Sequence, residues 1–348
     1  DWIEEKAPKY LDIIKHRAPR LFDKVLDESE IPEEIYPTQY ITERTIDFLK
    51  RFSDGKYGDK PFFLHCSFPD PHAPVCPPKK YREMYDPEKV QLPPSFNNFD
   101  LLYEHPALGT YANVLTRNHM RKTNEEEARK FIAYTYGAVS MIDHGIGQIL
   151  AALNSFGLDK NTIVIFTSDH GDFMADHGMI LKGAAHFQGV LKVPFIWKVP
   201  GVTKPGTISN SLASSIDIPT TILNLLDIKD KYRPKVMQGH NLTSILENPE
   251  NKVRDHCIIE EDQDYEDAKD LSNLPSLKVR TMITEDYRIT VYNKKGAGDL
   301  YNLKEDPYEL HNLWDDESLK ELKSKLLNKM LYELIKLQER TPRRQARA

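Results

Sequence analysis

The sequence has few cysteines, no long apolar run and no large excess of charge of either sign. Its three cysteines, Cys66, Cys76 and Cys257, are too few for a disulfide framework, and they fit a reducing compartment without requiring one. Because no apolar run approaches the length of a membrane-spanning helix, we expect neither a membrane segment nor a membrane partner. A net charge of -6 gives no reason to expect nucleic acid as a partner.

The sequence also lacks internal repeats and low-complexity segments. Hydrophobic residues make up 40% and charged residues 29% of the chain, a balance typical of a soluble globular protein. Its 348 residues suffice for one large α/β domain and a smaller second one. We predict that the two meet near residue 251, which gives an α/β domain over residues 1–250 and a C-terminal subdomain over residues 251–348.

One stretch combines a buried-strand pattern with groups able to do chemistry. Residues 162–166 are apolar, β-branched or aromatic without polar alternation, as in a parallel strand buried on both faces. Asp169 and His170 follow almost at once, at the end of the strand where open α/β sheets collect ligands. The two side chains can converge on one metal ion if the chain turns sharply, which Gly171 permits. Lys182, thirteen residues after Asp169, is a cation able to reach an anionic substrate.

Other segments fit a doubly wound, mostly parallel sheet with helices on its faces. Residues 61–68 form a second buried-strand candidate, and the proline-rich turn after them holds His72 with little flexibility. Residues 124–156 carry apolar side chains at helical spacing and lead into the strand at 162–166, as in a helix-then-strand unit. Residues 37–52 also predict a helix.

The pattern changes at about residue 251. Three short runs with alternating polarity, 257–260, 277–283 and 287–292, predict a small antiparallel sheet. Residues 318–338 carry an apolar stripe and predict a helix that packs on this sheet or on a partner. The predicted fold class is therefore α/β, a doubly wound mostly parallel sheet with a small C-terminal antiparallel sheet plus helix.

The segment TSDHGDFMADHGMILKG, residues 167–183, resembles the sulfatase branch of the alkaline phosphatase superfamily, whose pattern reads roughly T-S-D-[NH]-G, then G-D-H, then a lysine. The proline-rich turn around His72 resembles the family's P-H-x-P. Residues 300–313 resemble its closing L-Y-D-L-x-x-D-P-x-E-x-x-N-L. The resemblance covers nearly the whole chain, and it implies an alkaline-phosphatase-like fold that is incomplete at its N-terminal side.

The resemblance also implies roles for particular residues. Asp169 and His170 would be metal ligands, while His72 and Lys182 would bind the sulfate or phosphate group and act in catalysis. His186 lies near this predicted site and could donate a hydrogen bond to a substrate oxygen. Asp169 suits a hard cation, Ca²⁺ first and Mg²⁺ as an alternative. His170, in place of the commoner Asn, shifts the balance toward Mn²⁺ or a mixed site.

The family's nucleophile motif is C-or-S, x, P-or-A, x, R, and its first residue is converted to formylglycine. Cys76, followed by Pro78 and Lys80, resembles that motif superficially, but its segment matches the family's P-P-x-x-Y better. We therefore reject Cys76 as the nucleophile, and no other cysteine or serine has the required Pro and Arg. We expect formylglycine to be absent from this chain and the nucleophile to come from an upstream segment of a longer protein.

Three functions remain open. The first is metal-dependent hydrolysis of a sulfate ester of a small molecule or carbohydrate. The second is hydrolysis of a phosphodiester or phosphonate monoester, because enzymes of that branch also have His after the Asp and Lys thirteen residues beyond it. The third is a non-catalytic anion-binding relative, which the lack of a nucleophile favours. A homo-oligomer is compatible with all three.

Overall fold

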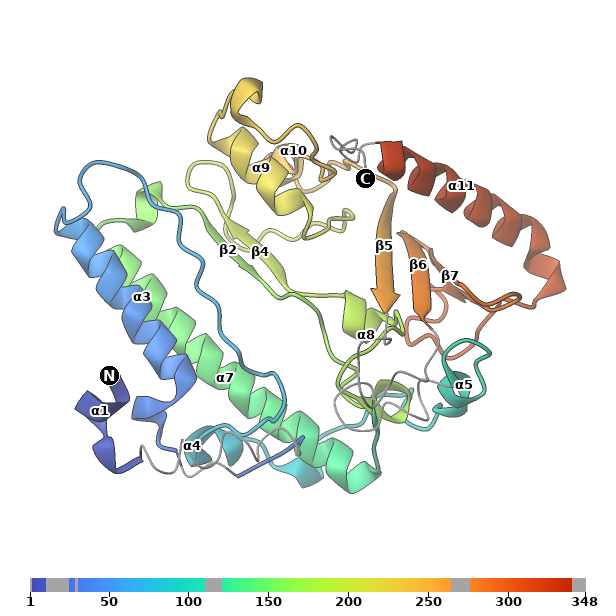
Figure 1. The fold of residues 1–348 in the computed structure, drawn as a ribbon, viewed down its shortest axis with the longest axis horizontal. Helices are drawn as coiled ribbons and strands as arrows, with labels where there is room; N and C mark the ends of the chain where they lie inside the picture. The colour runs from blue at the N-terminus through green and yellow to red at the C-terminus, as the bar shows by residue number, and fades with distance from the viewer. Residues whose placement is uncertain (1, 11–24, 29–30, 110–120, 264–275, 340–348) are drawn as a thin grey trace, which may run out of the picture. The chain divides into compact units, whose positions relative to one another are not determined.

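Figure 1 shows the computed structural model of the chain, which describes residues 2–10, 25–28, 31–109, 121–263 and 276–339. The chain divides into two compact units. The first unit comprises Asp1–Phe96, Thr116–Thr162 and Met174–Leu181, and the second comprises Asn97–Leu115, Ile163–Phe173 and Lys182–Ala348. These units are each made of several separate segments, whereas the predicted domains, 1–250 and 251–348, are continuous. The predicted division at residue 250 stays a prediction.

The first unit is mainly helical, with one short antiparallel strand pair. Its core lies along the longest helix, where Phe131 and Ala138 pack against Val75, Ala175 and Ile180. Its elements are α1 (Trp2–Lys6), η1 (Pro8–Tyr10), η2 (Glu33–Ile35), α3 (Pro37–Ser53), α4 (Lys79–Arg82), η3 (Pro87–Lys89), β1 (Arg121–Lys122), α7 (Glu125–Ser155), η4 (Asp159–Asn161), η5 (Asp176–Gly178) and β3 (Met179–Ile180).

Helix α7 begins at a side-chain cap. The Asn124 side chain accepts a hydrogen bond from the backbone N–H of Glu127 at 2.9 Å, and three glutamates in the first turn favour the positive end of the helix dipole. The helix ends just before Gly157, whose φ of +69° suits a glycine at a helix C-terminus. The predicted helices over 124–156 and 37–52 are thus confirmed as α7 and α3.

Two glycines of α7 let other elements of the first unit approach its backbone. Helix α3 lies alongside α7 (Figure 1), and a Cβ on Gly145 would stand 2.5 Å from the Thr42 hydroxyl oxygen. A Cβ on Gly137 would stand 2.4 Å from the carbonyl oxygen of Tyr81 in α4. Real Cβ atoms do not come this close, so both positions need glycine.

The second unit contains two separate antiparallel sheets. The larger has the strand order β5-β6-β7-β8, and the smaller consists of β2 and β4. The elements of this unit are α5 (Asp100–Tyr103), β2 (Val164–Thr167), α8 (Gln188–Leu191), β4 (Phe195–Lys198), α9 (Asp217–Leu225), η6 (Asp230–Tyr232), α10 (Thr243–Glu247), β5 (His256–Gln263), β6 (Leu277–Thr284), β7 (Tyr287–Tyr292), β8 (Gly298–Asn302), η7 (Glu317–Leu319) and α11 (Lys320–Glu339).

The C-terminal sheet and its helix form one apolar core. Met282, Ile289 and Leu300 lie on adjacent strands and are fully buried, and Leu326 and Met330 of α11 pack onto them. Figure 1 shows α11 running along this sheet. The predicted small antiparallel sheet with a closing helix is therefore confirmed.

Strand β2, which leads to Asp169, differs from its prediction. It pairs antiparallel with β4, with Val164 opposite Lys198 and Thr167 opposite Phe195. Its one described partner is thus antiparallel where a parallel one was expected, and Phe166 is 38% exposed where burial on both faces was expected. Burial on both faces requires flanking strands and covering helices, and among the described residues β4 is the only ladder partner of β2.

The predicted strand over residues 61–68 has no ladder partner within the described part of the chain. It runs extended and largely exposed, with Phe63 83% exposed. An apolar run predicts a strand only together with a partner, because the ladder hydrogen bonds stabilise the strand. The sequence pattern does not indicate which segment would be that partner.

Across the ranges given above, the helices are all too short or too polar to cross a membrane.

Two glycine substitutions in α7 test the close packing of the first unit. Gly137→Ala should destabilise the protein by about 1–3 kcal/mol, because the new methyl group meets the Tyr81 carbonyl. Gly147→Ala is the matched control: it lies in the same helix with nothing within 4 Å of the added Cβ, so it should stabilise the protein by roughly 0.5–1 kcal/mol. Urea denaturation of both variants measures the difference, and equal effects would contradict the packing.

Candidate active site

The chain turns directly after β2 so that Asp169 and His170 face each other. Asp169 Oδ1 accepts hydrogen bonds from the His170 backbone N–H at 3.0 Å and from the Ser168 hydroxyl at 3.2 Å. Its side chain is 85% exposed. Burial pushes the pKa of Asp169 up, but the adjacent His170 and these donors lower it more, so its pKa lies below the ordinary value and the group is a carboxylate at neutral pH.

The His170 ring is oriented by its own backbone. Its Nδ1 lies 2.7 Å from the Gly171 carbonyl oxygen, and because a carbonyl only accepts, Nδ1 carries the proton. In the neutral form of the ring, Nε2 then carries the lone pair, and it lies 3.7 Å from Asp169 Oδ2. A histidine that donates one ring N–H to a carbonyl and presents the other nitrogen is the usual arrangement of a metal-binding imidazole.

These two side chains fit part of a divalent-cation site. The Asp169 carboxylate suits Ca²⁺, Mg²⁺ or Mn²⁺, and the His170 imidazole shifts the balance toward Mn²⁺ or a mixed site. Within the described residues, no group of three or more His, Cys, Asp or Glu side chains is gathered in a way that could hold a metal ion. The role of Asp169 and His170 as metal ligands stays a prediction, and a complete site would need further ligands beside these two.

Gly171 is required for a reason that the sequence did not reveal. Its φ is not in the left-handed region, so the turn itself does not demand glycine. Instead, a Cβ at Gly171 would lie 2.0 Å from the carbonyl oxygen of Gly189, and the Gly171 N–H donates to the Val190 carbonyl at 2.7 Å. The Asp169–His170 turn therefore lies directly on residues 189–190.

Lys182 follows a strained stretch of backbone. Between the Asp169–His170 turn and Lys182, the non-glycine residues Met174, Ala175, His177 and Leu181 all have positive φ, at 48°, 75°, 51° and 71°. Each such conformation costs on the order of 1–3 kcal/mol and persists only where surrounding contacts impose it. Here the Ala175 N–H donates to the Met179 carbonyl at 2.8 Å, and the Thr123 N–H donates to Gly178. Lys182 itself is half-buried.

His72 belongs to the first unit, whereas Asp169, His170, Lys182 and His186 belong to the second. The His72 side chain is exposed, and its Nδ1 donates to the Ala73 carbonyl oxygen at 2.6 Å.

The loop that carries His72 is held by a half-buried carboxylate, that of Asp70. Asp70 accepts hydrogen bonds from the Thr38 hydroxyl at 2.5 Å and from the Tyr36 hydroxyl at 3.2 Å. Burial raises the pKa of Asp70, and the two hydroxyl donors oppose that rise. Both donors come from the start of α3, so this helix fixes the loop two residues before His72.

His186 does not offer a nitrogen to a substrate. It is 1% exposed, with Nδ1 2.9 Å from the Thr281 hydroxyl and Nε2 2.9 Å from Glu261 Oε2. Both ring nitrogens are thus engaged with the C-terminal sheet. The predicted role of His186 as a substrate-binding residue is not supported by this geometry.

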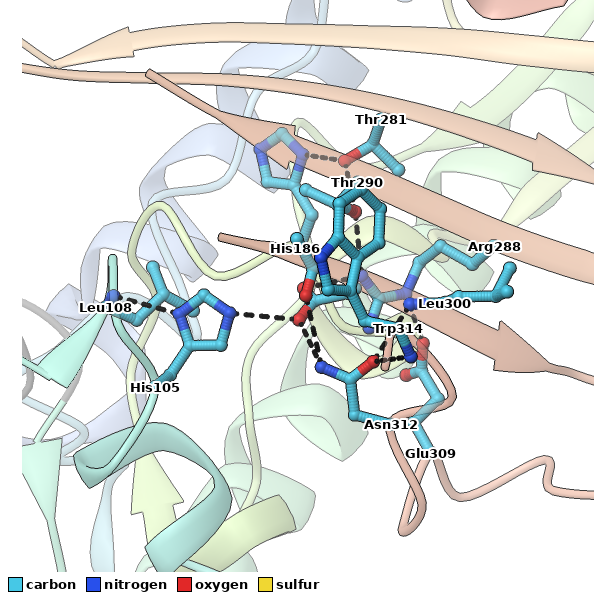
Figure 2. A network of polar contacts seen from close by, with 12 residues as sticks. His105, Leu108, His186, Thr281, Arg288, Thr290, Leu300, Glu309, Asn312 and Trp314 are labelled. Carbon is cyan, nitrogen blue, oxygen red and sulfur yellow. Dashed lines mark hydrogen bonds and ion pairs between the residues drawn. The ribbon is translucent and has the colours of Figure 1, made fainter. Parts of the chain in front are cut away.

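Sequence reasoning missed a buried polar network on the C-terminal sheet (Figure 2). Arg288 is fully buried, with its guanidinium 4.9 Å from the Phe187 ring and 4.6 Å from the Tyr301 ring. It pairs with Glu309, whose other carboxylate oxygen accepts the Gln188 backbone N–H at 2.7 Å. The available signal was the D-P-Y-E run over residues 306–309, which resembles a family pattern but indicates no partner.

Comparison with known proteins identifies the family. The sulfatase family model matches residues 3–228. The chain belongs to the sulfatase family. A model of the C-terminal region of N-sulphoglucosamine sulphohydrolase matches residues 176–337 of this sulfatase-family chain. The resemblance noted in the sequence is thereby confirmed.

Individual relatives support the same assignment. An arylsulfatase of Clostridium perfringens is 31% identical over 83% of this chain and 56% of the relative. The multifunctional alkaline phosphatase superfamily protein PehA of Trinickia caryophylli is 28% identical over 90% of this chain and 62% of its own length. The chain thus spans roughly three fifths of the curated relatives it matches. The phosphonate monoester hydrolase of Agrobacterium radiobacter has a TM-score of 0.76 at 23% identity, covering 94% of this chain and 69% of that one, which confirms the alkaline-phosphatase-like fold.

Thr38→Val tests the support of the His72 loop. The variant removes a hydrogen bond to a half-buried carboxylate and should cost about 1.5–3 kcal/mol where Asp70 is ionised. Asp70 becomes charged only above its raised folded-state pKa, so the cost should shrink as the pH falls through that value. Urea titrations at several pH values measure it. Thr135→Val is the control, since its hydroxyl bonds only the Phe131 carbonyl of its own helix, and its smaller cost should not vary with pH.

Proposed function

We propose that this protein hydrolyses sulfate esters in a metal-dependent reaction. The observation that carries the proposal is the Asp169–His170 pair, in which the Nδ1 contact to the Gly171 carbonyl leaves His170 Nε2 facing the Asp169 carboxylate. In a member of the sulfatase family, this pair is the expected place for a divalent cation, Ca²⁺ first and Mg²⁺ or Mn²⁺ as alternatives.

Lys182 and His72 are the groups that we assign to the substrate anion. A sulfate ester resists nucleophilic attack because its oxygens are negatively charged, so neutralising that charge lowers the barrier. A divalent cation held by Asp169 and His170 would supply Lewis-acid stabilisation of a sulfate oxygen. Lys182 would add a positive charge, and His72, whose Nδ1 contacts the Ala73 carbonyl oxygen, would meet the anion through Nε2.

No residue of this chain is assigned as the nucleophile. Burial raises the pKa of the Cys66 and Cys257 thiols, which disfavours the reactive thiolate. Cys76 is half-buried, with its sulfur 3.9 Å from the Tyr36 hydroxyl, and it stays rejected on its sequence context. Formylglycine is accordingly not placed at any of the three cysteines.

Relatives support a carbohydrate or small-molecule sulfate ester as the substrate. An endo-4-O-sulfatase and a Δ4,5-hexuronate-2-O-sulfatase, both of Bacteroides thetaiotaomicron, are each 28% identical to this chain. One specific feature favours the second candidate, a phosphodiester or phosphonate monoester hydrolase: His170 stands where Asn is commoner, and Lys182 lies thirteen residues after Asp169. Matched aryl sulfate, phosphonate and phosphodiester substrates separate the two.

Lys182→Ala should lower kcat/KM for an aryl sulfate by about 10²–10³-fold in the protein as its gene encodes it, because one charge-stabilising group is lost. Lys182→Arg should retain part of the activity. Lys192→Ala is the control, since that lysine lies on the exposed end of α8 and should leave the rate unchanged. Equal rates for the two alanine variants would show that Lys182 does not act on the substrate.

Removal of divalent cations should abolish turnover, and adding back one metal at a time should restore it. The order of activity among Ca²⁺, Mg²⁺ and Mn²⁺ identifies the working ion. Calorimetry with sulfate, run in parallel, detects a protein that binds the anion without turnover. That result would replace the proposed function by non-catalytic anion binding.

A further inference from the structure

The segment that begins at Lys182 is attached to the C-terminal sheet by a histidine. His186, four residues after Lys182, is 1% exposed. Its Nδ1 lies 2.9 Å from the Thr281 hydroxyl on β6, and its Nε2 lies 2.9 Å from Glu261 Oε2 on β5. The ring therefore spans two neighbouring strands and cannot turn without breaking both contacts.

A second attachment lies two residues further along. The Gln188 N–H donates to Glu309 Oε2 at 2.7 Å, and the other oxygen of Glu309 pairs with Arg288. Glu309 is 2% exposed and has a φ of 54°, so its backbone is held in a conformation unusual for glutamate. Because this buried carboxylate binds both a guanidinium and a backbone amide, it holds the Gln188 backbone in place on the sheet.

The two attachments belong to one network. Arg288 donates to the Thr290 hydroxyl at 2.9 Å, and Thr290 contacts the Thr281 hydroxyl at 2.8 Å. Thr281 in turn contacts His186. Figure 2 shows His186, Thr281, Arg288 and Glu309 converging from the loop and the sheet.

The same segment also contacts the Asp169–His170 turn. The Gly171 N–H donates to the Val190 carbonyl at 2.7 Å, and the Gly171 backbone lies so close to Gly189 that a Cβ would stand 2.0 Å from its carbonyl oxygen. Residues 186–190 thus lie between the C-terminal sheet and the turn that carries Asp169 and His170.

We propose that His186 and Glu309 are positioning residues, which fix residues 182–190 on the C-terminal sheet and thereby set Lys182 and the Asp169–His170 turn relative to each other. The predicted effect on turnover rests on the proposed function. The predicted effect on the backbone does not, because it concerns only contacts within the second unit.

The test compares Glu309→Ala, Glu309→Gln and His186→Gln in the protein as its gene encodes it. Glu309→Ala should lower kcat by roughly ten- to a hundredfold, since small displacements of catalytic groups cost this much. Glu309→Gln keeps an acceptor oxygen for the Gln188 N–H and should retain more activity. His186→Gln can still donate to Glu261 and should fall between them.

Hydrogen–deuterium exchange gives a readout that does not depend on activity. The Gln188 and Gly171 amides should exchange faster in Glu309→Ala, while the amides of α9 should not change. Thr221→Val is the control for general destabilisation: it is fully buried in α9, it accepts the Leu242 N–H at 3.0 Å, and it should leave kcat and Gly171 exchange unchanged.

Each outcome decides the proposal. Folded Glu309 variants with unchanged Gly171 exchange and unchanged kcat would overturn it, and so would a Thr221→Val variant that reproduces their effects. If Glu309→Ala fails to fold, the two glutamine variants decide. If the unmodified protein turns over no sulfate, phosphonate or phosphodiester ester, the proposed function fails, while faster Gly171 exchange would still support the positioning role.

Discussion

A fully buried guanidinium is the constraint on which the second unit depends. An isolated charge in a protein interior is very costly, so Arg288 requires carboxylates and further hydrogen-bonding groups around it. Asp299 and Glu309 supply the charge, and two aromatic rings cover the faces of the guanidinium. Burial alone would raise the pKa of Asp299, but the contacts with His105 and Arg288 lower this pKa by more than burial raises it. The aspartate therefore stays ionised. Strands β7 and β8 and the loop with Glu309 therefore have to assemble together.

Each of the two candidate site loops is supported by a carboxylate that bonds donors far away in the sequence. Asp70 fixes the loop before His72 through hydroxyls of α3, and Glu309 fixes the segment after Lys182 through a backbone amide. Burial raises the pKa of both carboxyl groups. The residues that would meet the substrate are exposed or half-buried, while Glu309 is buried and Asp70 is half-buried. The side chains that would contact the substrate are thus different from those that hold the loops in place.

Local periodicity and short motifs explain what the sequence could predict. The helices over 37–53 and 125–155, the C-terminal sheet and the Asp169–His170 turn depend on residues close together in the chain. The partners of strands and side chains could not be predicted in this way. Strand β2 pairs with a strand whose pattern did not mark it as antiparallel, and His186 contacts residues 95 and 75 positions away. The left-handed conformations at Met174, Ala175 and Leu181 could not be predicted from the sequence either, because none of these residues is glycine.

Within the described part of the chain, the two-stranded sheet that leads to the candidate site has unpaired outer edges. Strands β2 and β4 pair only with each other among the described residues, and Ile196 on β4 is 61% exposed. Backbone N–H and C=O groups on an open edge can accept another strand, from the same chain or from a neighbouring one. A strand added beside β2 would extend the sheet that ends at Asp169. The strand that leads to the candidate metal ligands is therefore also one beside which a further strand can pair.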